Sequence, residues 1–123
     1  MSKRILIVED QEDNRMIMSD VLSAAGYELI EAVNGKDGVS RAQSDRPDLI
    51  LMDIQMPVLD RYEATRQIKA DSNLKSTPII AVTSYALSGD EAKARSAGCD
   101  GYVSKPFSPR QLLARVREYL PDP

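Results

Sequence analysis

The chain has 123 residues, the length of one domain, and its 42% apolar and 28% charged residues are ordinary for a globular protein. Sixteen Lys and Arg against nineteen Asp and Glu give a net charge of −3. This charge argues against a nucleic-acid-binding domain, because such domains usually carry a basic face. The absence of histidine excludes Ser-His-Asp and Cys-His triads, zinc sites that need imidazole, and a phosphohistidine on this chain.

No segment has the character of a membrane span or a signal peptide. The longest apolar runs, such as ILIV and LILM, are far shorter than the ~20 residues that a span requires. The N-terminal SKR leads directly into a strand-like run, with no small-residue cleavage site. Cys99 is the single cysteine and cannot form an internal disulfide, which fits a reducing cytosol. We therefore expect a cytoplasmic protein with no membrane and no nucleic-acid partner.

Short apolar runs alternate with helical patterns along the chain. They predict strands at Ile5–Val8, Tyr27–Val33, Leu49–Met52, Ile79–Val82 and Gly101–Val103. Strands that alternate with helices predict βαβ units, and hence a parallel sheet with helices on both faces. No repeat, low-complexity tract or linker divides the sequence, so we expect a single domain over residues 1–123.

The ends of the predicted helices carry local signals. Gly26 and Gly98 suit the position just after a helix, where the backbone turns left-handed. Three pairs have capping-box spacing, which marks a helix start: Asp60 with Glu63, Ser88 with Glu91, and Ser108 with Gln111. Apolar residues of the last helix recur at three- and four-residue steps and predict one buried face: Leu112, Leu113, Val116, Tyr119 and Leu120.

The composition of the strands suggests their order. ILIV, LILM and IIAV are continuous apolar runs, as expected of strands buried on both sides. The second run contains Glu28 and Glu31, and the fifth is short and polar, so these two suit the edges. The pattern is compatible with the order 2-1-3-4-5, a flavodoxin-like doubly wound (βα)5 fold with three α/β/α layers.

Polar residues follow four of the predicted strands. Glu9 and Asp10 end the first strand, Asp53 the third and Thr83 the fourth, and Lys105 follows the fifth. Ligands of open parallel sheets bind at these carboxyl ends. Three carboxylates ~5 Å apart would repel one another by roughly 3 kcal/mol per pair at an effective dielectric of 20. The cluster therefore predicts a bound cation, and few, partly exposed oxygen ligands suit Mg²⁺.

Each residue of this set also has an ordinary interpretation. Glu9 and Asp10 can be a solvated strand end with a helix N-cap, Thr83 a β-branched strand residue and Lys105 a surface lysine. Asp53 is harder to dismiss, because it directly follows LILM and a buried carboxylate needs a partner.

The loop EDQEDN after the first strand argues against two other ligands. Its carboxylates would repel a flavin phosphate, and it lacks the glycines of a nucleotide-binding turn.

The segments ILIVED, LILMDIQMP, IIAVTS and YVSKP, in this order and at these strand ends, resemble the receiver domain of two-component response regulators. The resemblance covers essentially the whole chain, and we therefore expect no DNA-binding output domain. Among subfamilies, the chain is most similar to single-domain regulators of the cell-division (DivK-like) type, a stand-alone class like the chemotaxis regulators, and to receivers fused to hybrid kinases.

The resemblance implies a phosphoacceptor site. Asp53 would attack a phosphohistidine on a sensor histidine kinase or a histidine phosphotransfer protein. Asp10, Asp53 and the backbone carbonyl of Gln55 would ligate Mg²⁺, and Glu9 would hold metal-bound water. This agrees with the general chemistry of phosphoryl transfer, which depends on positioning and on charge neutralisation.

The resemblance also implies a switch. Lys105 would pair with a phosphoryl oxygen, and the peptide between Lys105 and Pro106 would be cis. Thr83 would hydrogen-bond the phosphoryl group, and Tyr102 would turn inward as Thr83 moves. The chain would then be no enzyme but a monomeric switch that takes part in its own phosphorylation chemistry. It would contact a downstream protein through the face formed by the fourth helix, the fifth strand and the last helix.

The chain departs from the family pattern in two places. Many receivers have Gly in the loop before the third helix, where this chain has Arg61, and the acidic pair is Glu9-Asp10 rather than two aspartates. Gln55 and Tyr85 would tune the lifetime of the phosphorylated form. Two alternatives stay open. A hydrolase of the aspartate-phosphate type usually needs an acid at the position of Gln55, and a docking pseudo-receiver would not need Asp10, Asp53, Thr83 and Lys105 intact.

Overall fold

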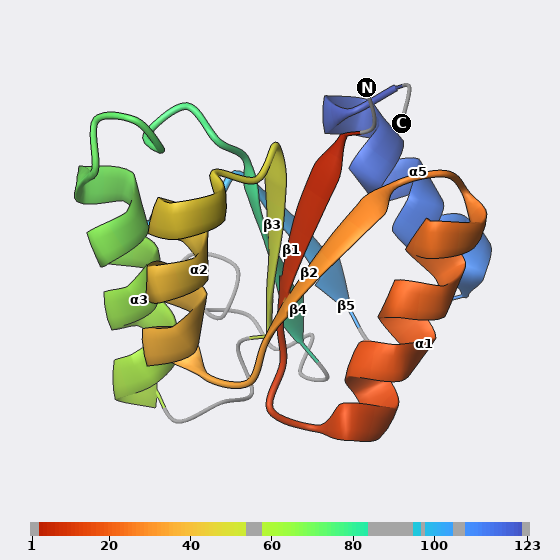
Figure 1. Ribbon diagram of the computed structural model, residues 1–123, viewed down its shortest axis with the longest axis horizontal. Helices are drawn as coiled ribbons and strands as arrows, with labels where there is room; N and C mark the ends of the chain where they lie inside the picture. The colour runs from red at the N-terminus through yellow and green to blue at the C-terminus, as the bar shows by residue number, and fades with distance from the viewer. Residues whose placement is uncertain (1–2, 54–57, 84–94, 97, 105–107, 122–123) are drawn as a thin grey trace.

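Five parallel strands form one sheet in the order β2-β1-β3-β4-β5 (Figure 1). The strands are β1 Arg4–Val8, β2 Glu28–Ala32, β3 Leu49–Asp53, β4 Ile79–Thr83 and β5 Gly101–Ser104. This computed structural model describes residues 3–53, 58–83, 95–96, 98–104 and 108–121, with the backbone alone at 58–62, 83 and 104. The predicted strand order, with β2 and β5 at the edges, is confirmed.

Helices cover both faces of the sheet. Figure 1 shows α1 (Glu12–Ala24) and α5 (Pro109–Tyr119) on one face, and α2 (Gly35–Asp45) and α3 (Val58–Ala70) on the other. The predicted three-layer, doubly wound fold is therefore confirmed. The helix expected between Ser88 and Gly98 lies largely outside the described residues. Within the described ranges, no helix combines the length and the apolar character needed to cross a bilayer.

The core consists of two apolar layers separated by the sheet. Alternate residues of the central strands enter each layer, as Ile5 and Ile7 do on the α1–α5 side and Leu6 and Val8 on the α2–α3 side. All five residues of β3 are buried, whereas β2 exposes both of its glutamates. A strand that is covered on both faces must be apolar throughout, which explains why the continuous runs form the centre.

The predicted helix signals are confirmed at both ends of the chain. Gly26 and Gly98 have φ values of 100° and 114°, a backbone region that favours glycine. Ser108 begins α5 with a complete capping box: its Oγ accepts from the Gln111 N–H at 3.1 Å, and the Gln111 side chain accepts from the Ser108 N–H at 2.8 Å.

The prediction for the start of the third helix is wrong. α3 begins at Val58, so Asp60 and Arg61 lie inside its first turn rather than in a preceding loop. Residue 61 therefore has helical backbone and needs no positive φ. Arg is a good helix former and Gly a poor one, which fits a helix that includes this position. The expected strain from Arg61 is thereby removed.

Candidate functional site

The three acidic residues predicted to form a site lie at the carboxyl ends of the two central strands. Val8, the last residue of β1, is in register with Met52, and Asp53 ends β3 next to it. Glu9 and Asp10 follow β1 directly, and the Glu9 N–H donates to the carbonyl of Ala32 at 3.0 Å. Parallel pairing of β1 and β3 thus brings together residues that are more than forty positions apart.

The end of β1 is held in place by a close approach of α2. A Cβ on Gly38 would lie 2.8 Å from a methyl carbon of Val8, so only glycine fits there without movement of the Val8 side chain or of α2. The Asn34 side chain caps the same helix and accepts from the N–H of Asp37 at 2.7 Å. The glycine lets α2 pack close to β1, and the cap fixes where α2 begins, so together they position α2 against the strand that precedes Glu9.

The three carboxylates form a compact cluster. Glu9 is 0% exposed, Asp53 is 2% exposed and Asp10 is exposed. One oxygen from each lies within 4.8 Å of the others. At 4.8 Å two unit charges repel by about 3.5 kcal/mol at an effective dielectric constant of about 20. Hard oxygen ligands at this spacing, one of them open to solvent, suit Mg²⁺ with retained water.

Arg15 on α1 borders the cluster, and the sequence analysis missed it. Its Nη1 donates to the backbone carbonyl of Glu9 at 3.0 Å, and its Nε pairs with Glu31 of β2 at 3.3 Å. The arginine therefore ties the turn after β1 to the edge strand and sets the backbone of Glu9. No local signal marks this role, since Glu31 is 16 positions away in the chain.

The other predicted site residues are only partly described. Thr83 ends β4 opposite Ser104 of β5, so the strand register places Thr83 at the same edge as Asp53. Tyr102 is half-buried and packs against the core layer on the α3 side, rather than standing fully in water as an edge residue could. Gln55, Lys105 and Pro106, together with the predicted cis peptide, lie outside the described residues.

Cys99 is not suited to act as a nucleophile. Burial raises the pKa of its thiol from 9.0 to about 11, although the hydroxyl of Thr65 opposes this shift from 4.0 Å away. A thiol with such a pKa is almost entirely protonated near neutral pH, and the thiolate is the reactive form. The Cys99 thiol is therefore not a candidate nucleophile near neutral pH.

The family model of the response regulator receiver domain matches residues 5–117. The chain belongs to this family. Membership makes it a receiver, which acts as a phosphoacceptor in two-component signalling. The match agrees with the resemblance stated from the sequence, and it spans both the acidic cluster and the Thr83 and Lys105 positions.

Relatives of this receiver are similar over nearly the whole chain. The polar-differentiation response regulator DivK of Brucella anthropi is 43% identical, over 99% of this chain and 99% of the relative. DivK of Brucella ovis is 42% identical over the same shares. These similarities place the receiver close to the DivK type of response regulator, as the sequence motifs indicated.

Two solved structures confirm the fold. The chemotaxis protein CheY4 of Vibrio cholerae has a TM-score of 0.91 at 30% identity, covering 97% of this chain and 99% of that chain. The receiver domain of a Pseudomonas aeruginosa sensor histidine kinase has a TM-score of 0.90 at 37% identity, covering 99% and 100%. That domain holds a magnesium ion coordinated in its active-site cleft.

Proposed function

We propose that Asp53 is the phosphoacceptor of this receiver. The observation that carries the proposal is a carboxylate, 2% exposed at the end of a buried central strand, with an oxygen within 4.8 Å of oxygens of Glu9 and Asp10. An Asp53 oxygen attacks the phosphorus of a phosphohistidine on the partner. The P–N bond breaks, its electron pair and a proton go to the imidazole, and an aspartyl phosphate forms.

Asp10, Asp53 and the backbone carbonyl of Gln55 would hold Mg²⁺, and Glu9 would hold a water molecule bound to the ion. The acidic cluster fits the ion, because it offers one exposed and two buried carboxylates within a 4.8 Å spacing. When bound, Mg²⁺ supplies positive charge that offsets the repulsion between the carboxylates and the incoming phosphoryl oxygens. The magnesium ion in the sensor-kinase receiver supports this assignment.

Two further residues complete the proposed site. Lys105 pairs with a phosphoryl oxygen, and the Lys105–Pro106 peptide is cis. Thr83 donates a hydrogen bond to the phosphoryl group, and Tyr102 reports this change by its movement. The strand register supports this proposal, because Thr83 follows the partner of Asp53 at the carboxyl end of β4, and Tyr102 lies on the neighbouring strand β5.

The partners follow from the same chemistry. A histidine kinase or a histidine phosphotransfer protein delivers the phosphoryl group, since the chain itself contains no histidine. A downstream protein then binds the phosphorylated form through the face that includes β5, α5 and the helix before β5. We place the protein in the cytoplasm as a monomeric switch without separate enzymatic activity, and the single-domain organisation over residues 1–123 stays a prediction.

Intact-mass measurement tests the acceptor. Wild type incubated with acetyl phosphate and Mg²⁺ is expected to gain one phosphoryl group, with acetate as the leaving group, and Asp53→Asn is expected to gain none. Asp20→Asn is the matched control, because Asp20 is an exposed aspartate on α1 and its loss changes the net charge equally. Equal uptake by wild type and Asp53→Asn would rule out Asp53, and no uptake by either would favour a docking pseudo-receiver.

A further inference from the structure

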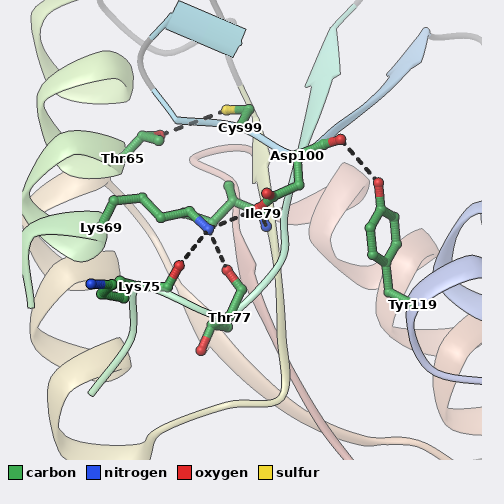
Figure 2. A network of polar contacts seen from close by, with 8 residues as sticks. All are labelled: Thr65, Lys69, Lys75, Thr77, Ile79, Cys99, Asp100 and Tyr119. Atoms are coloured by element: carbon green, nitrogen blue, oxygen red, sulfur yellow. Dashed lines mark hydrogen bonds and ion pairs between the residues drawn. The ribbon is translucent and has the colours of Figure 1, made fainter. Parts of the chain in front are cut away.

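Asp100 lies just before β5, at the amino-terminal ends of the strands, whereas the acidic cluster lies at their carboxyl ends. It contacts three different elements (Figure 2). Its carboxylate oxygen Oδ2 accepts from the Lys69 ammonium of α3 at 2.8 Å and from the backbone N–H of Ile79 at 2.9 Å. Its own N–H donates to the Ile79 carbonyl at 2.7 Å. Its carbonyl accepts from the Tyr119 hydroxyl of α5 at 3.0 Å. Asp100 is therefore held from both faces of the sheet.

Lys69 is held as firmly as the carboxylate that it pairs with. An ammonium group has three donors, and Nζ donates to Asp100, to the Thr77 carbonyl at 2.7 Å and to the Lys75 carbonyl at 3.3 Å. The side chain is only 18% exposed and comes from the last turn of α3, where a cation also suits the helix dipole. Lys69 thus ties the Asp100 carboxylate to α3 and to the segment that follows it.

The contacts with Ile79 lie one position before the paired part of the two strands. The first pair in register is Ile80 with Gly101, so Ile79 and Asp100 are the next residues back along β4 and β5. One backbone and one carboxylate hydrogen bond join these two residues in opposite directions. Ile79 is 0% exposed, and removal of the carboxylate would take away the side-chain acceptor of its N–H.

β5 is the strand that most needs such a restraint. It has four residues, lies at the edge and pairs with β4 alone. Side chains alternate between faces, so a slip of one residue would exchange Tyr102 and Val103, which now pack into opposite core layers. Such a slip would also move the end of β5 by about 3.3 Å.

We propose that Asp100 and Lys69 form a register clamp, which fixes β5 against β4 at the amino-terminal ends of these two strands. The clamp thereby positions Lys105 for phosphoryl transfer at their carboxyl ends. Ser104 ends β5 opposite Thr83, and Lys105 is the next residue in the chain. The clamp residues are positioning residues, because they lie at the far ends of the strands from the acidic cluster. The link to Lys105 rests on the proposed function, whereas the register claim does not.

Three variants dissect the clamp. Asp100→Ala removes both carboxylate contacts, Asp100→Asn keeps an acceptor for the Ile79 N–H but loses the charge, and Lys69→Met keeps the stem but loses the ammonium. Arg41→Met is the matched control, since it removes the exposed Arg41–Asp37 ion pair on α2. Tyr27→Phe controls for a general loss of stability, because the Tyr27 hydroxyl donates to the Leu120 carbonyl rather than to a residue of β4 or β5.

Two measurements on the folded variants test the proposal. Amide hydrogen exchange by NMR is expected to rise about tenfold or more across β5 in Asp100→Ala, with β1 and β3 unchanged. Phosphoryl uptake from acetyl phosphate is expected to slow about tenfold, at unchanged Mg²⁺ affinity, because the proposed metal ligands follow β1 and β3. Lys69→Met and Asp100→Asn are expected to fall between Asp100→Ala and wild type, and they carry the test if Asp100→Ala does not fold.

The outcomes separate the clamp from the acceptor site. Unchanged β5 exchange in all three clamp variants would overturn the register claim, and raised exchange with normal uptake would overturn the positioning of Lys105. Slowing of the same size in Tyr27→Phe would reduce the effect to general stability and overturn the positioning claim. If wild type takes up no phosphoryl group, the Asp53 assignment fails, and β5 exchange alone decides the clamp.

Discussion

Binding of Mg²⁺ to the acidic cluster is expected to stabilise the fold, and Asp53→Asn is expected to remove most of this gain. The three carboxylate oxygens lie within 4.8 Å of one another, and two unit charges at that distance repel by about 3.5 kcal/mol at an effective dielectric constant of about 20, with less repulsion for pairs that include exposed Asp10. Asp53→Asn removes two of the three pairs and one proposed metal ligand. The variant therefore has less repulsion for a cation to relieve.

The expected gain follows from linkage. At a Mg²⁺ concentration one hundred times the dissociation constant, wild type gains about 2.7 kcal/mol of unfolding free energy. For a chain of this length that corresponds to a rise in Tm of about 10 °C. At the same Mg²⁺ concentration, Asp53→Asn is expected to gain about 1 kcal/mol or less, since both the attraction to the ion and its affinity fall.

The assay compares urea or thermal unfolding in excess chelator with unfolding in saturating Mg²⁺, for each variant. Any charge that the fold itself places beside the cluster is common to the two conditions, so the difference isolates the added ion. Asp20→Asn is expected to keep the full Mg²⁺ effect, because this aspartate lies on the exposed surface of α1. Equal Mg²⁺ gains in wild type and Asp53→Asn would refute the assignment of the metal to this cluster.

Four further outcomes are expected. Asp10→Asn should weaken Mg²⁺ binding in a titration more than Glu9→Gln, because Asp10 is a proposed direct ligand and Glu9 acts through water; the reverse ranking would exchange these roles. Tyr27→Phe should lower the unfolding free energy in urea by about 1–3 kcal/mol, since it leaves a buried carbonyl at the end of α5 without the 2.6 Å hydrogen bond; an unchanged midpoint would contradict this. Burial raises the pKa of the Cys99 thiol from 9.0 to about 11, so its contribution to stability is present below pH 9.0 and is lost as the pH rises to about 11; Cys99→Ala should flatten this part of the stability profile, and parallel profiles would argue against it. Phosphorylated Thr83→Ala should lack the amide NMR shifts that wild type shows over residues 86–105, and identical shifts would mean that the signal leaves the site by another route.

Local sequence signals determined much of the fold. Continuous apolar runs identified the three central strands, because a strand covered on both faces has no polar side to present. The Ser108 capping box and the glycines at 26 and 98 were correct, because a cap depends on residues within one turn of itself. The acidic cluster was predictable too, since the strand order alone brings Asp53 beside the end of β1.

Features that depend on how the elements pack could not be predicted from the sequence. The start of α3 was misplaced at Asp60, because capping-box spacing also occurs inside helices. α2 ends at Arg46, whose backbone is left-handed at φ 47°. Because this residue is not a glycine, the sequence gives no signal for the end of the helix. β2 is shorter than its apolar run, and Tyr27 instead turns inward to bond the Leu120 carbonyl, 93 positions away.

The sequence by itself located the strands approximately, favoured their order and showed the carboxylates at their ends, because these follow from apolar runs and polar residues a few positions long. Only the tertiary structure decided which polar groups meet across the layers. Arg15 reaches the turn after β1, and Lys69 reaches Asp100, 31 positions away. Such pairs depend on the height and angle at which each helix packs against the sheet. That geometry is set by the fit of whole core layers rather than by the residues that bond.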